Sequence, residues 1–308
     1  MKLGFDAKRL FCNYTGLGNY SRSLVKNLSQ QYPQNKYNLY TPKVKNKEES
    51  AYFLNKESFQ TYLSKSMLKA YWRSYSISKE LQKNGVELFH GLSNEIPLNL
   101  NKYNVRGIVT IHDLIFKVYP NTYSYFDRII YDWKFKTSCK KADKIIAISQ
   151  STKKDIVKYY GIDPSKIEVI YQTCAPLFYE QNDKVDSTPL FDKYKIPTNY
   201  LLFVGSVEKR KNLQLIIKAY EHIPKEIQIP LIIVGGNKGE KESILKLIAT
   251  NKLQDKIIWV TNLGDNYQLQ KLYQKATAVV YPSLYEGFGL PVVEALLSKT
   301  PVITSNVS

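Results

Sequence analysis

The sequence predicts an α/β protein made of two doubly wound domains, each with a largely parallel sheet covered by helices on both faces. The chain has 308 residues, which is more than one hydrophobic core usually serves, so two domains are expected. Short apolar and β-branched runs alternate with helical stretches, as in parallel sheets that are buried on both faces. This alternation breaks once, between residues 173 and 199, and then resumes.

The first domain is expected over residues 1–172 and the second over residues 200–308. In the first, β-branched and aromatic runs predict strands at 2–7, 37–42, 87–92, 107–113, 144–149 and 167–172. Helices are expected between them, for example at 19–31, 124–141 and 150–160. In the second domain, strands are expected at 200–205, 231–236, 256–261, 277–282 and 301–306.

Residues 173–199 are expected to link the two domains, because Pro176, Pro189, Pro197 and scattered charges interrupt the pattern there. Ligands of open α/β sheets bind outside the carboxyl ends of the strands, so the two domains should face a cleft. The sequence stops just after the fifth strand of the second domain, where such a sheet usually continues. The second domain is therefore expected to be incomplete at its C-terminal end.

The positive charge is concentrated in the first domain. The whole chain has a net charge of +17; residues 1–172 hold 28 Lys and Arg against 14 Asp and Glu, which is +14, and the remainder carries +3. This asymmetry favours an anionic partner for the first domain, such as a phospholipid surface, a pyrophosphate lipid or a nucleic acid. A lysine-rich composition without a partner is the alternative. Because no nucleic-acid-reading motif is present, no nucleic-acid partner is expected.

Residues 58–75 predict a basic amphipathic helix that could lie on an anionic membrane. Its apolar residues recur near helical spacing, and its cations are four residues apart on another face. The apolar residues are Phe59, Leu63, Met67, Tyr71 and Tyr75, and the cations are Lys65, Lys69 and Arg73. A helix that packs on the first domain and leaves its basic face in water is the alternative.

Apolar runs, cysteines and metal-ligand spacings bear on localisation and metal content. No long apolar run suggests a secretion signal or a membrane-spanning helix, so a cytoplasmic protein is expected, with peripheral contact at the inner face of the cytoplasmic membrane left open. The three cysteines lie far apart, which predicts free thiols in a reducing compartment. No Cys or His spacing typical of a metal site is present, so no metal is expected.

Two short stretches of the first domain suggest a ligand site. Gly16 and Gly18 follow the first strand and open a helix, where backbone N–H groups can approach an anion, although a plain tight turn would look the same. His112 and Asp113 end a buried strand and should point into the cleft. The imidazole could donate a hydrogen bond to a substrate hydroxyl; a strand-end histidine satisfied by the backbone is the alternative.

A basic cluster follows the first strand of the second domain. Lys209, Arg210 and Lys211 stand at a strand–helix junction. Adjacent cations suit a diphosphate, because arginine clamps it through planar donors and lysine acts as a point charge. A solvated basic turn is the alternative.

Two glutamates flank a tight turn in "EGFGLPVVE", where Glu286 precedes the turn and Glu294 lies about one turn into the next helix. Proline near the start of that helix fits its first turn. Each carboxylate can accept hydrogen bonds from two hydroxyls, which suits polyol binding. A surface acid and a separate acid favoured by the helix dipole would be the alternative.

Together these stretches resemble a retaining family 4 glycosyltransferase of the GT-B fold, in which two Rossmann-like domains face a cleft. The most specific match is the family's pair of glutamates with seven residues between them, Glu286 and Glu294. The stretches "GLGNY", "HDL", "EKRKN" and "PVITSN" occur in the family's order. The chain departs from many relatives at Lys209, where proline is common, at Ser206, where arginine is common, and near Thr173, where glycine is common.

The resemblance implies roles for individual residues. Glu294 would hold the ribose of a nucleotide sugar, and Arg210 with Lys211 would neutralise the leaving diphosphate in place of a metal ion. Glu286 would hold the donor sugar and phosphate together with the backbone of Phe288, Gly289 and Leu290. In the first domain, Gly16 would line the phosphate pocket and His112 would contact the donor sugar near the reacting centre.

The predicted function is therefore metal-independent, retaining transfer of a hexose, with mannose as the first guess, from a GDP- or UDP-linked donor. The acceptor would be a growing surface polysaccharide, such as lipopolysaccharide, or a lipid-linked oligosaccharide. A sugar-nucleotide epimerase of the same fold and a catalytically impaired, truncated nucleotide-binding protein are the alternatives.

Overall fold

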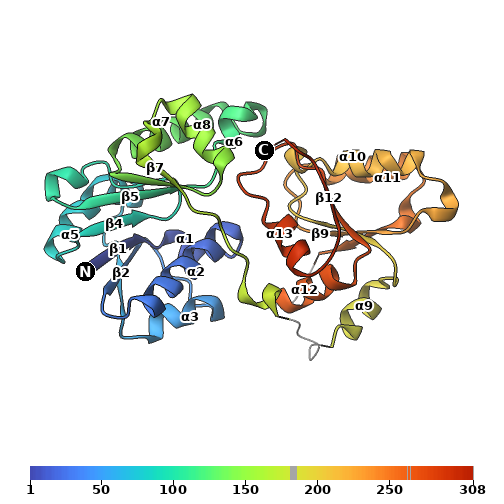
Figure 1. The fold of residues 1–308 in the computed structure, drawn as a ribbon, viewed down its shortest axis with the longest axis horizontal. Coiled ribbons are helices and arrows are strands. Elements are labelled where there is room, and N and C mark those ends of the chain that lie inside the picture. Colours follow the sequence, from blue (N-terminus) through green and yellow to red (C-terminus); the bar gives the residue numbers. More distant parts are fainter. Residues whose placement is uncertain (181–185, 262, 264, 308) are drawn as a thin grey trace. The chain divides into compact units, whose positions relative to one another are not determined.

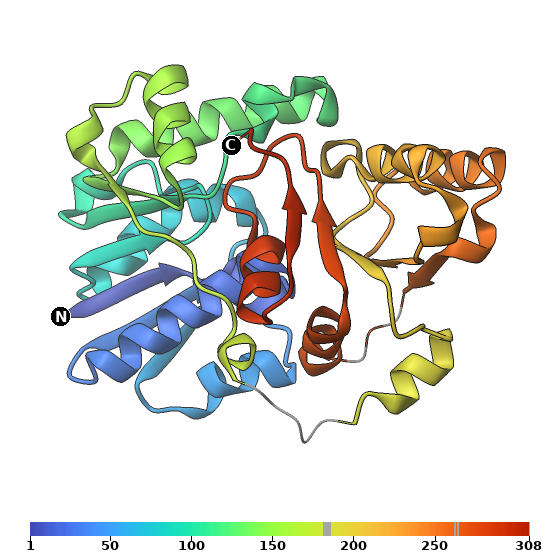
Figure 2. The same ribbon diagram turned by 45° about the vertical axis from the view of Figure 1, so that its right-hand side comes forward.

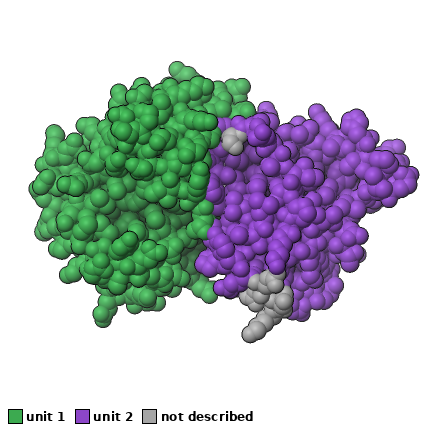
Figure 3. Space-filling view, in the orientation of Figure 1, with its two compact units in different colours: residues 1–173 green, residues 174–308 purple. Residues whose placement is uncertain are grey.

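The chain divides into two units, residues 1–173 and 174–308 (Figure 3). We describe a computed structural model, which covers residues 1–180, 186–261, 263 and 265–307. Each unit contains one sheet whose strands are all parallel, flanked by helices (Figure 1). The predicted α/β class with two parallel sheets is confirmed.

The first unit contains a seven-stranded sheet in the order β3-β2-β1-β4-β5-β6-β7. Its strands are β1 (Lys2–Asp6), β2 (Lys36–Thr41), β3 (Phe59–Leu63), β4 (Leu88–Gly91), β5 (Arg106–Ile111), β6 (Lys144–Ala147) and β7 (Ile167–Val169). Six of these lie where the sequence predicts strands. The order reverses at β1 and β4, as in doubly wound sheets, whose ligand sites lie at this kind of switch point.

The helices of the first unit cover both faces of its sheet, with α2 and α3 on one side and α7 and α8 on the other (Figure 1). They are α1 (Lys8–Cys12), α2 (Gly16–Gln31), α3 (Glu48–Asn55), α4 (Lys69–Tyr71), α5 (Ile77–Lys83), α6 (Ile115–Val118), α7 (Tyr125–Lys141) and α8 (Gln150–Tyr160). Ser124 caps α7 and Ser149 caps α8 by accepting backbone N–H groups of the first turn. The three predicted helices are confirmed to within a few residues.

The prediction of one helix over residues 58–75 is wrong. The segment begins with strand β3, continues without regular secondary structure over residues 64–68 to α4, and ends in a π-helical turn at Trp72–Ser76. β3 pairs with β2 in parallel, so that Phe59 lies beside Tyr37, and the rings of Tyr40 and Tyr62 stack with centroids 4.8 Å apart. These long-range contacts with β2 outweigh the helical spacing, which is a local signal only.

The second unit contains a five-stranded sheet in the order β10-β9-β8-β11-β12. Its strands are β8 (Leu201–Val204), β9 (Leu231–Val234), β10 (Ile257–Val260), β11 (Ala278–Tyr281) and β12 (Val302–Thr304), all where the sequence predicts them. The helices are α9 (Thr188–Tyr194), α10 (Leu213–Ala219), α11 (Lys241–Thr250), α12 (Asn266–Lys275) and α13 (Leu290–Leu297). One apolar core joins α10 and α11 to the sheet, and another joins α9, α12 and α13 to it.

The described residues after Thr173 in the segment expected to be a linker belong to the second unit. Cys174, Phe178 and Leu190 are buried in the core that α12 and α13 cover, and the ring of Phe178 meets that of Tyr273 edge-on at 5.9 Å. The boundary between the units therefore falls after Thr173. Two of the three prolines that suggested a linker instead lie at the start of helical turns, Pro176 in the 3₁₀ turn Pro176–Tyr179 and Pro189 in the first turn of α9.

Candidate active site

The candidate site of the second unit is built from two strand–helix junctions on neighbouring strands. β8 and β11 are paired in parallel, so their carboxyl ends lie at the same edge of the sheet. The basic turn Lys209–Lys211 follows β8, and the turn between β11 and α13 carries Glu286. The N–H of Leu284 donates to the carbonyl of Arg210 at 2.8 Å and joins the two turns. In Figure 2, α13 (red) lies against the strands β11 and β12.

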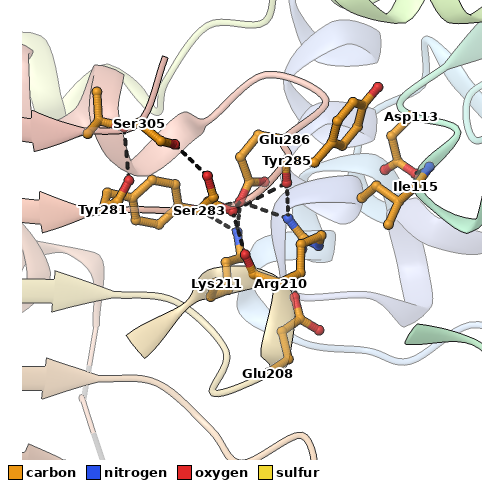
Figure 4. Close-up of polar contacts among 11 residues, drawn as sticks. Asp113, Ile115, Glu208, Arg210, Lys211, Tyr281, Ser283, Tyr285, Glu286 and Ser305 are labelled. Carbon is orange, nitrogen blue, oxygen red and sulfur yellow. Dashed lines mark hydrogen bonds and ion pairs between the residues drawn. The ribbon is translucent and has the colours of Figure 1, made fainter. Parts of the chain in front are cut away.

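Glu286 lies at the centre of a network of polar contacts (Figure 4). Its Oε1 is 2.6 Å from the ammonium of Lys211 and 2.7 Å from the guanidinium of Arg210. The same oxygen accepts hydrogen bonds from Ser283 at 2.6 Å and from Tyr281 at 3.0 Å. One carboxylate oxygen thus contacts two cations and two hydroxyls, so two of the predicted cations and the first glutamate belong to one polar network.

Arg210 and Lys211 are both held from several sides. Arg210 donates to the carbonyl of Tyr285 at 2.7 Å and to Glu208 at 2.6 Å. Lys211 is buried. Its ammonium lies 4.8 Å from the centre of the Tyr281 ring and also donates to the Tyr281 hydroxyl. The alternative of a solvated basic turn therefore fails for these two cations, although Lys209 is exposed.

Burial and charge act against each other in this network. Burial favours the neutral form of Glu286, but Lys211 and Arg210 outweigh it and lower the pKa of the carboxyl. Burial lowers the pKa of the Lys211 ammonium, with Glu286 opposing it. Burial also opposes the charge of Arg210, yet Glu286 and Glu208 raise its pKa. Glu286 and Arg210 are therefore charged near neutral pH, and any phosphate that approaches must share the cations with Glu286.

Gly289 gives the turn its shape. Its φ is +86°, in the left-handed region that favours glycine, and it precedes the first residue of α13, Leu290. Pro291 lies in the first turn of α13, as predicted. Phe288, Gly289 and Leu290 are all half-buried. The N–H groups that open α13 thus follow Glu286 by only a few residues.

The second glutamate of the pair has a different partner. Glu294 lies on α13, and its Oε2 accepts a hydrogen bond from Tyr273 of α12 at 2.9 Å. Burial raises the pKa of Glu294, with the Tyr273 hydroxyl opposing it. Burial also raises the pKa of Tyr273 well above its ordinary value. The two glutamates therefore lie in unlike surroundings: Glu286 contacts cations, and Glu294 contacts a neutral hydroxyl.

In the first unit, His112 directly follows β5 and is 3% exposed. Its Nε2 lies 2.9 Å from the carbonyl oxygen of Leu92, and its Nδ1 lies 3.0 Å from the amide nitrogen of Gln172. Since a carbonyl only accepts, Nε2 carries the proton and Nδ1 accepts from Gln172. Burial lowers the pKa of His112 to about 4, so the ring is neutral at pH 7.

This geometry matches the alternative of a strand-end histidine satisfied by the backbone. The N–H that we expected to reach a substrate hydroxyl is directed to Leu92 instead. Asp113 accepts from the backbone N–H of Ile115 at 3.2 Å, which closes a local turn (Figure 4). Contact between His112 and a donor sugar stays a prediction.

Sequence reasoning missed the side chains that surround His112. The ring of Tyr20 meets it edge-on at 4.8 Å, and the Tyr20 hydroxyl lies 2.9 Å from that of Thr110, which in turn lies 2.8 Å from Nε2 of His90. Thr110 was the available signal, because a polar residue inside an apolar strand requires a hydrogen-bonding partner.

The glycine turn of the first unit is held by Asn13. Gly16 is the first residue of α2, and the Asn13 side chain accepts from the N–H groups of Thr15 at 3.0 Å and Gly18 at 3.1 Å. A Cβ at Gly18 would lie 1.7 Å from the carbonyl oxygen of Asn13, so packing alone requires that glycine. Phosphate contact at Gly16 stays a prediction.

Two further properties concern the described residues alone. Outside 181–185, 262, 264 and 308, no group of three or more His, Cys, Asp or Glu side chains could hold a metal ion. Among those same residues, no helix has the length and apolar character needed to cross a membrane.

Two protein-family models match the chain. Residues 14–173, more than half of the chain, match the family described as Glycosyltransferase Family 4. The chain belongs to this family. Residues 186–308, which include the Glu286 network, match the Glycosyl transferases group 1. The chain is thus a glycosyltransferase, as its resemblance implied.

Relatives of this glycosyltransferase include two enzymes named for mannose transfer. The O-antigen chain mannosyltransferase B of Escherichia coli is 28% identical over 326 positions, which cover 100% of this chain and 83% of that protein. The O-antigen chain mannosyltransferase RfbU of Salmonella typhimurium is 33% identical over 199 positions, which cover 65% of this chain and 52% of that protein.

Solved structures show the same fold at low identity. Anabaena Alr3699/HepE in complex with UDP superposes with a TM-score of 0.70 at 16% identity, covering 100% of this chain and 81% of that one. WaaG, a glycosyltransferase involved in lipopolysaccharide biosynthesis, superposes with a TM-score of 0.71, with the same identity and coverage. These likenesses support the GT-B fold expected from the sequence.

Proposed function

We propose that this glycosyltransferase moves a hexose, with mannose as the first candidate, from a GDP- or UDP-linked donor to a growing surface polysaccharide or a lipid-linked oligosaccharide. The observation that carries the proposal is the buried network of Glu286, Arg210 and Lys211 at the carboxyl ends of β8 and β11. Two cations at this edge suit a nucleoside diphosphate, and the names of two relatives favour mannose.

In the proposed reaction, Arg210 and Lys211 stabilise the charge that develops on the leaving diphosphate. They are held in place before the ligand arrives, since Glu286, Tyr285 and Tyr281 already orient them. Without a ligand, Glu286 balances the positive charge of Arg210 and Lys211. A bound diphosphate would balance part of that positive charge instead. No metal ion would then be needed.

Glu286 would hold the donor sugar once the diphosphate shares its cations, together with the backbone of Phe288, Gly289 and Leu290. Glu294 would accept hydrogen bonds from the ribose hydroxyls. Transfer with retention would proceed by attack from the face that the diphosphate leaves, so that no protein nucleophile is required.

The proposal is tested by a screen of nucleotide sugars, with separate detection of glycan product and released diphosphate. GDP-mannose with a mannose-containing or lipid-linked acceptor should give both. Conversion of the sugar nucleotide without an acceptor would favour an epimerase. The absence of a thermal shift with every GDP and UDP ligand would overturn the nucleotide-sugar site, and a shift without turnover would favour an impaired nucleotide-binding protein.

The proposed acceptor also bears on membranes. If the acceptor is lipid-linked, the enzyme must work at a bilayer surface, and the first unit carries the net charge of +14 that suits anionic lipid. Residues 58–75 do not form the expected helix, yet Met67 is 97% exposed and Leu68 is 70% exposed. Membrane contact through this segment stays a prediction.

A further inference from the structure

Helix α7 of the first unit carries an exposed apolar face. Tyr125, Phe126, Ile129, Ile130 and Trp133 are between 48% and 76% exposed. Their positions repeat at three and four residues, so they share one side of the helix. We call these five residues the α7 face.

The fold of the first unit does not bury this face. α7 is attached to the unit by its other side, where Phe135 and Cys139 enter the core beside β5 and β6. Isolated apolar residues on a surface need no explanation, but a contiguous aromatic patch marks an interaction site. The α7 face is therefore free for something outside the unit's own core.

The charges on and near α7 are mainly positive. Lys136, Lys140 and Lys141 follow the face and are exposed. The two carboxylates of α7 are already engaged, because Asp127 accepts from Ser124 at 2.7 Å and Asp132 pairs with Lys117 at 2.7 Å. An apolar, aromatic surface is thus followed by lysines, and the five cations of α7 outnumber its two carboxylates.

We propose that the α7 face docks on the surface of an anionic lipid bilayer, with its aromatic side chains at the level of the headgroups and its lysines on the lipid phosphates. Tyr and Trp favour that depth because one end of each side chain is polar. A bilayer supplies apolar and anionic surface together. A second copy of the chain would instead bring another first unit of charge +14 against this one, which repels it.

The π-helical turn that follows the exposed segment is linked to α7 by ion pairs. Glu95 pairs with Lys134 of α7 at 3.1 Å and with Arg73 of the π-helical turn at 3.7 Å. Tyr71, just before that turn, is 57% exposed. Glu95 therefore links the π-helical turn at the end of the segment that the sequence suggested for membrane contact to α7 at Lys134.

The test measures binding of the 308-residue chain to vesicles without any sugar. Vesicles of phosphatidylcholine alone are compared with vesicles that also contain phosphatidylglycerol, by sedimentation and by tryptophan emission. Trp133 is 52% exposed and Trp72 is 2% exposed, so a blue shift that disappears in Trp133→Phe reports insertion of the α7 face. Binding should be stronger to anionic vesicles and should weaken as salt rises.

Phe126→Ser combined with Ile130→Ser should weaken binding to anionic vesicles by about tenfold or more. Leu215→Ser with Leu245→Ser, exposed apolar positions of α10 and α11, is the matched control and should leave binding unchanged. Equal loss in both pairs, or none in either, would overturn the proposal.

Two further variants separate the remaining outcomes. Loss of binding in Met67→Ser with Tyr71→Ser, but not in the α7 pair, would assign the contact to the earlier segment and overturn the proposal. Dimers that the α7 pair abolishes, without vesicle binding, would identify a second copy as the occupant. The inference rests on the proposed function only through the lipid-linked acceptor. A chain that binds vesicles but transfers no sugar would contradict the proposed function alone.

Discussion

His112 in the first unit and Glu286 in the second are both enclosed by protein, yet burial has opposite outcomes for their charge. His112 has neutral partners, the Leu92 carbonyl and the Gln172 amide, so loss of water dominates and lowers its pKa to about 4. Glu286 contacts two cations, which overcome the loss of water and lower the pKa of the carboxyl. Burial thus neutralises a group without a counter-ion and leaves a paired group charged.

The polar networks of the two units thus differ in charge. The network of the second unit holds charges in position and suits a charged diphosphate. The network of the first unit consists of hydrogen bonds among uncharged groups: the hydroxyl of Thr110 lies between that of Tyr20 and the ring of His90, and His112 contacts Leu92 and Gln172. Substitutions and a change of pH should therefore affect the two networks differently.

Removing the carboxylate at the centre of the charged network should have the largest effect. Glu286→Gln leaves Lys211 buried without its acid, and breaking such a pair costs about 3 kcal/mol of unfolding free energy. Urea denaturation at pH 7.5 measures the loss. Glu226→Gln, at an exposed glutamate of the same unit, should change stability by less than about 0.5 kcal/mol. Equal effects of the two changes would mean that the network does not bear on stability.

Removing one cation should slow the reaction more than it weakens donor binding. Lys211→Ala should lower kcat about 100-fold while KM for the donor changes little, because the charge on the diphosphate grows in the transition state. Lys209→Ala, at the exposed neighbour, is the control and should leave both constants near their original values. A rise in KM at constant kcat would contradict leaving-group stabilisation.

The neutral histidines should make the protein less stable in acid. Burial lowers the pKa of His90 and of His112 from 6.5 to about 4. Between these values the unfolded chain takes up protons that the folded chain does not, so stability is lost as the pH falls below 6.5. At pH 5 the cost is on the order of 2 kcal/mol for each ring. Urea denaturation of the wild type and of His90→Gln at several pH values between 7.5 and 5 measures this loss. If the unfolding free energy falls equally with pH in both proteins, the lowered pKa of His90 is contradicted.

The smallest effect is expected at the second glutamate. Glu294→Ala should weaken nucleotide binding about tenfold, because it removes the acceptors for two ribose hydroxyls. Tyr273→Phe removes only the hydrogen bond to Glu294 and should weaken binding less. Calorimetry with GDP and UDP compares the variants. Unchanged affinity in Glu294→Ala would show that the ribose assignment is wrong.

The sequence was informative wherever local pattern and tertiary contacts agreed. The strands of the second unit are buried apolar runs, and α7 and α8 begin at serine caps that could be found in the sequence. It failed at residues 58–75 and in the described parts of the expected linker, 173–199. In the first, pairing of Phe59 and Tyr62 with β2 prevailed over helical spacing; in the second, burial of Phe178 and Leu190 prevailed over proline content.

The sequence alone identified the pair Glu286 and Glu294, the adjacent cations and the strand-end histidine, because these residues lie close together in the chain or at the ends of recognisable strands. Only the tertiary structure decided which charges meet. Arg210 and Glu286 are 76 residues apart in the sequence, and they come within 2.7 Å because β8 and β11 are neighbours in the sheet. Strand order is set by packing over the whole unit, and no local pattern encodes it.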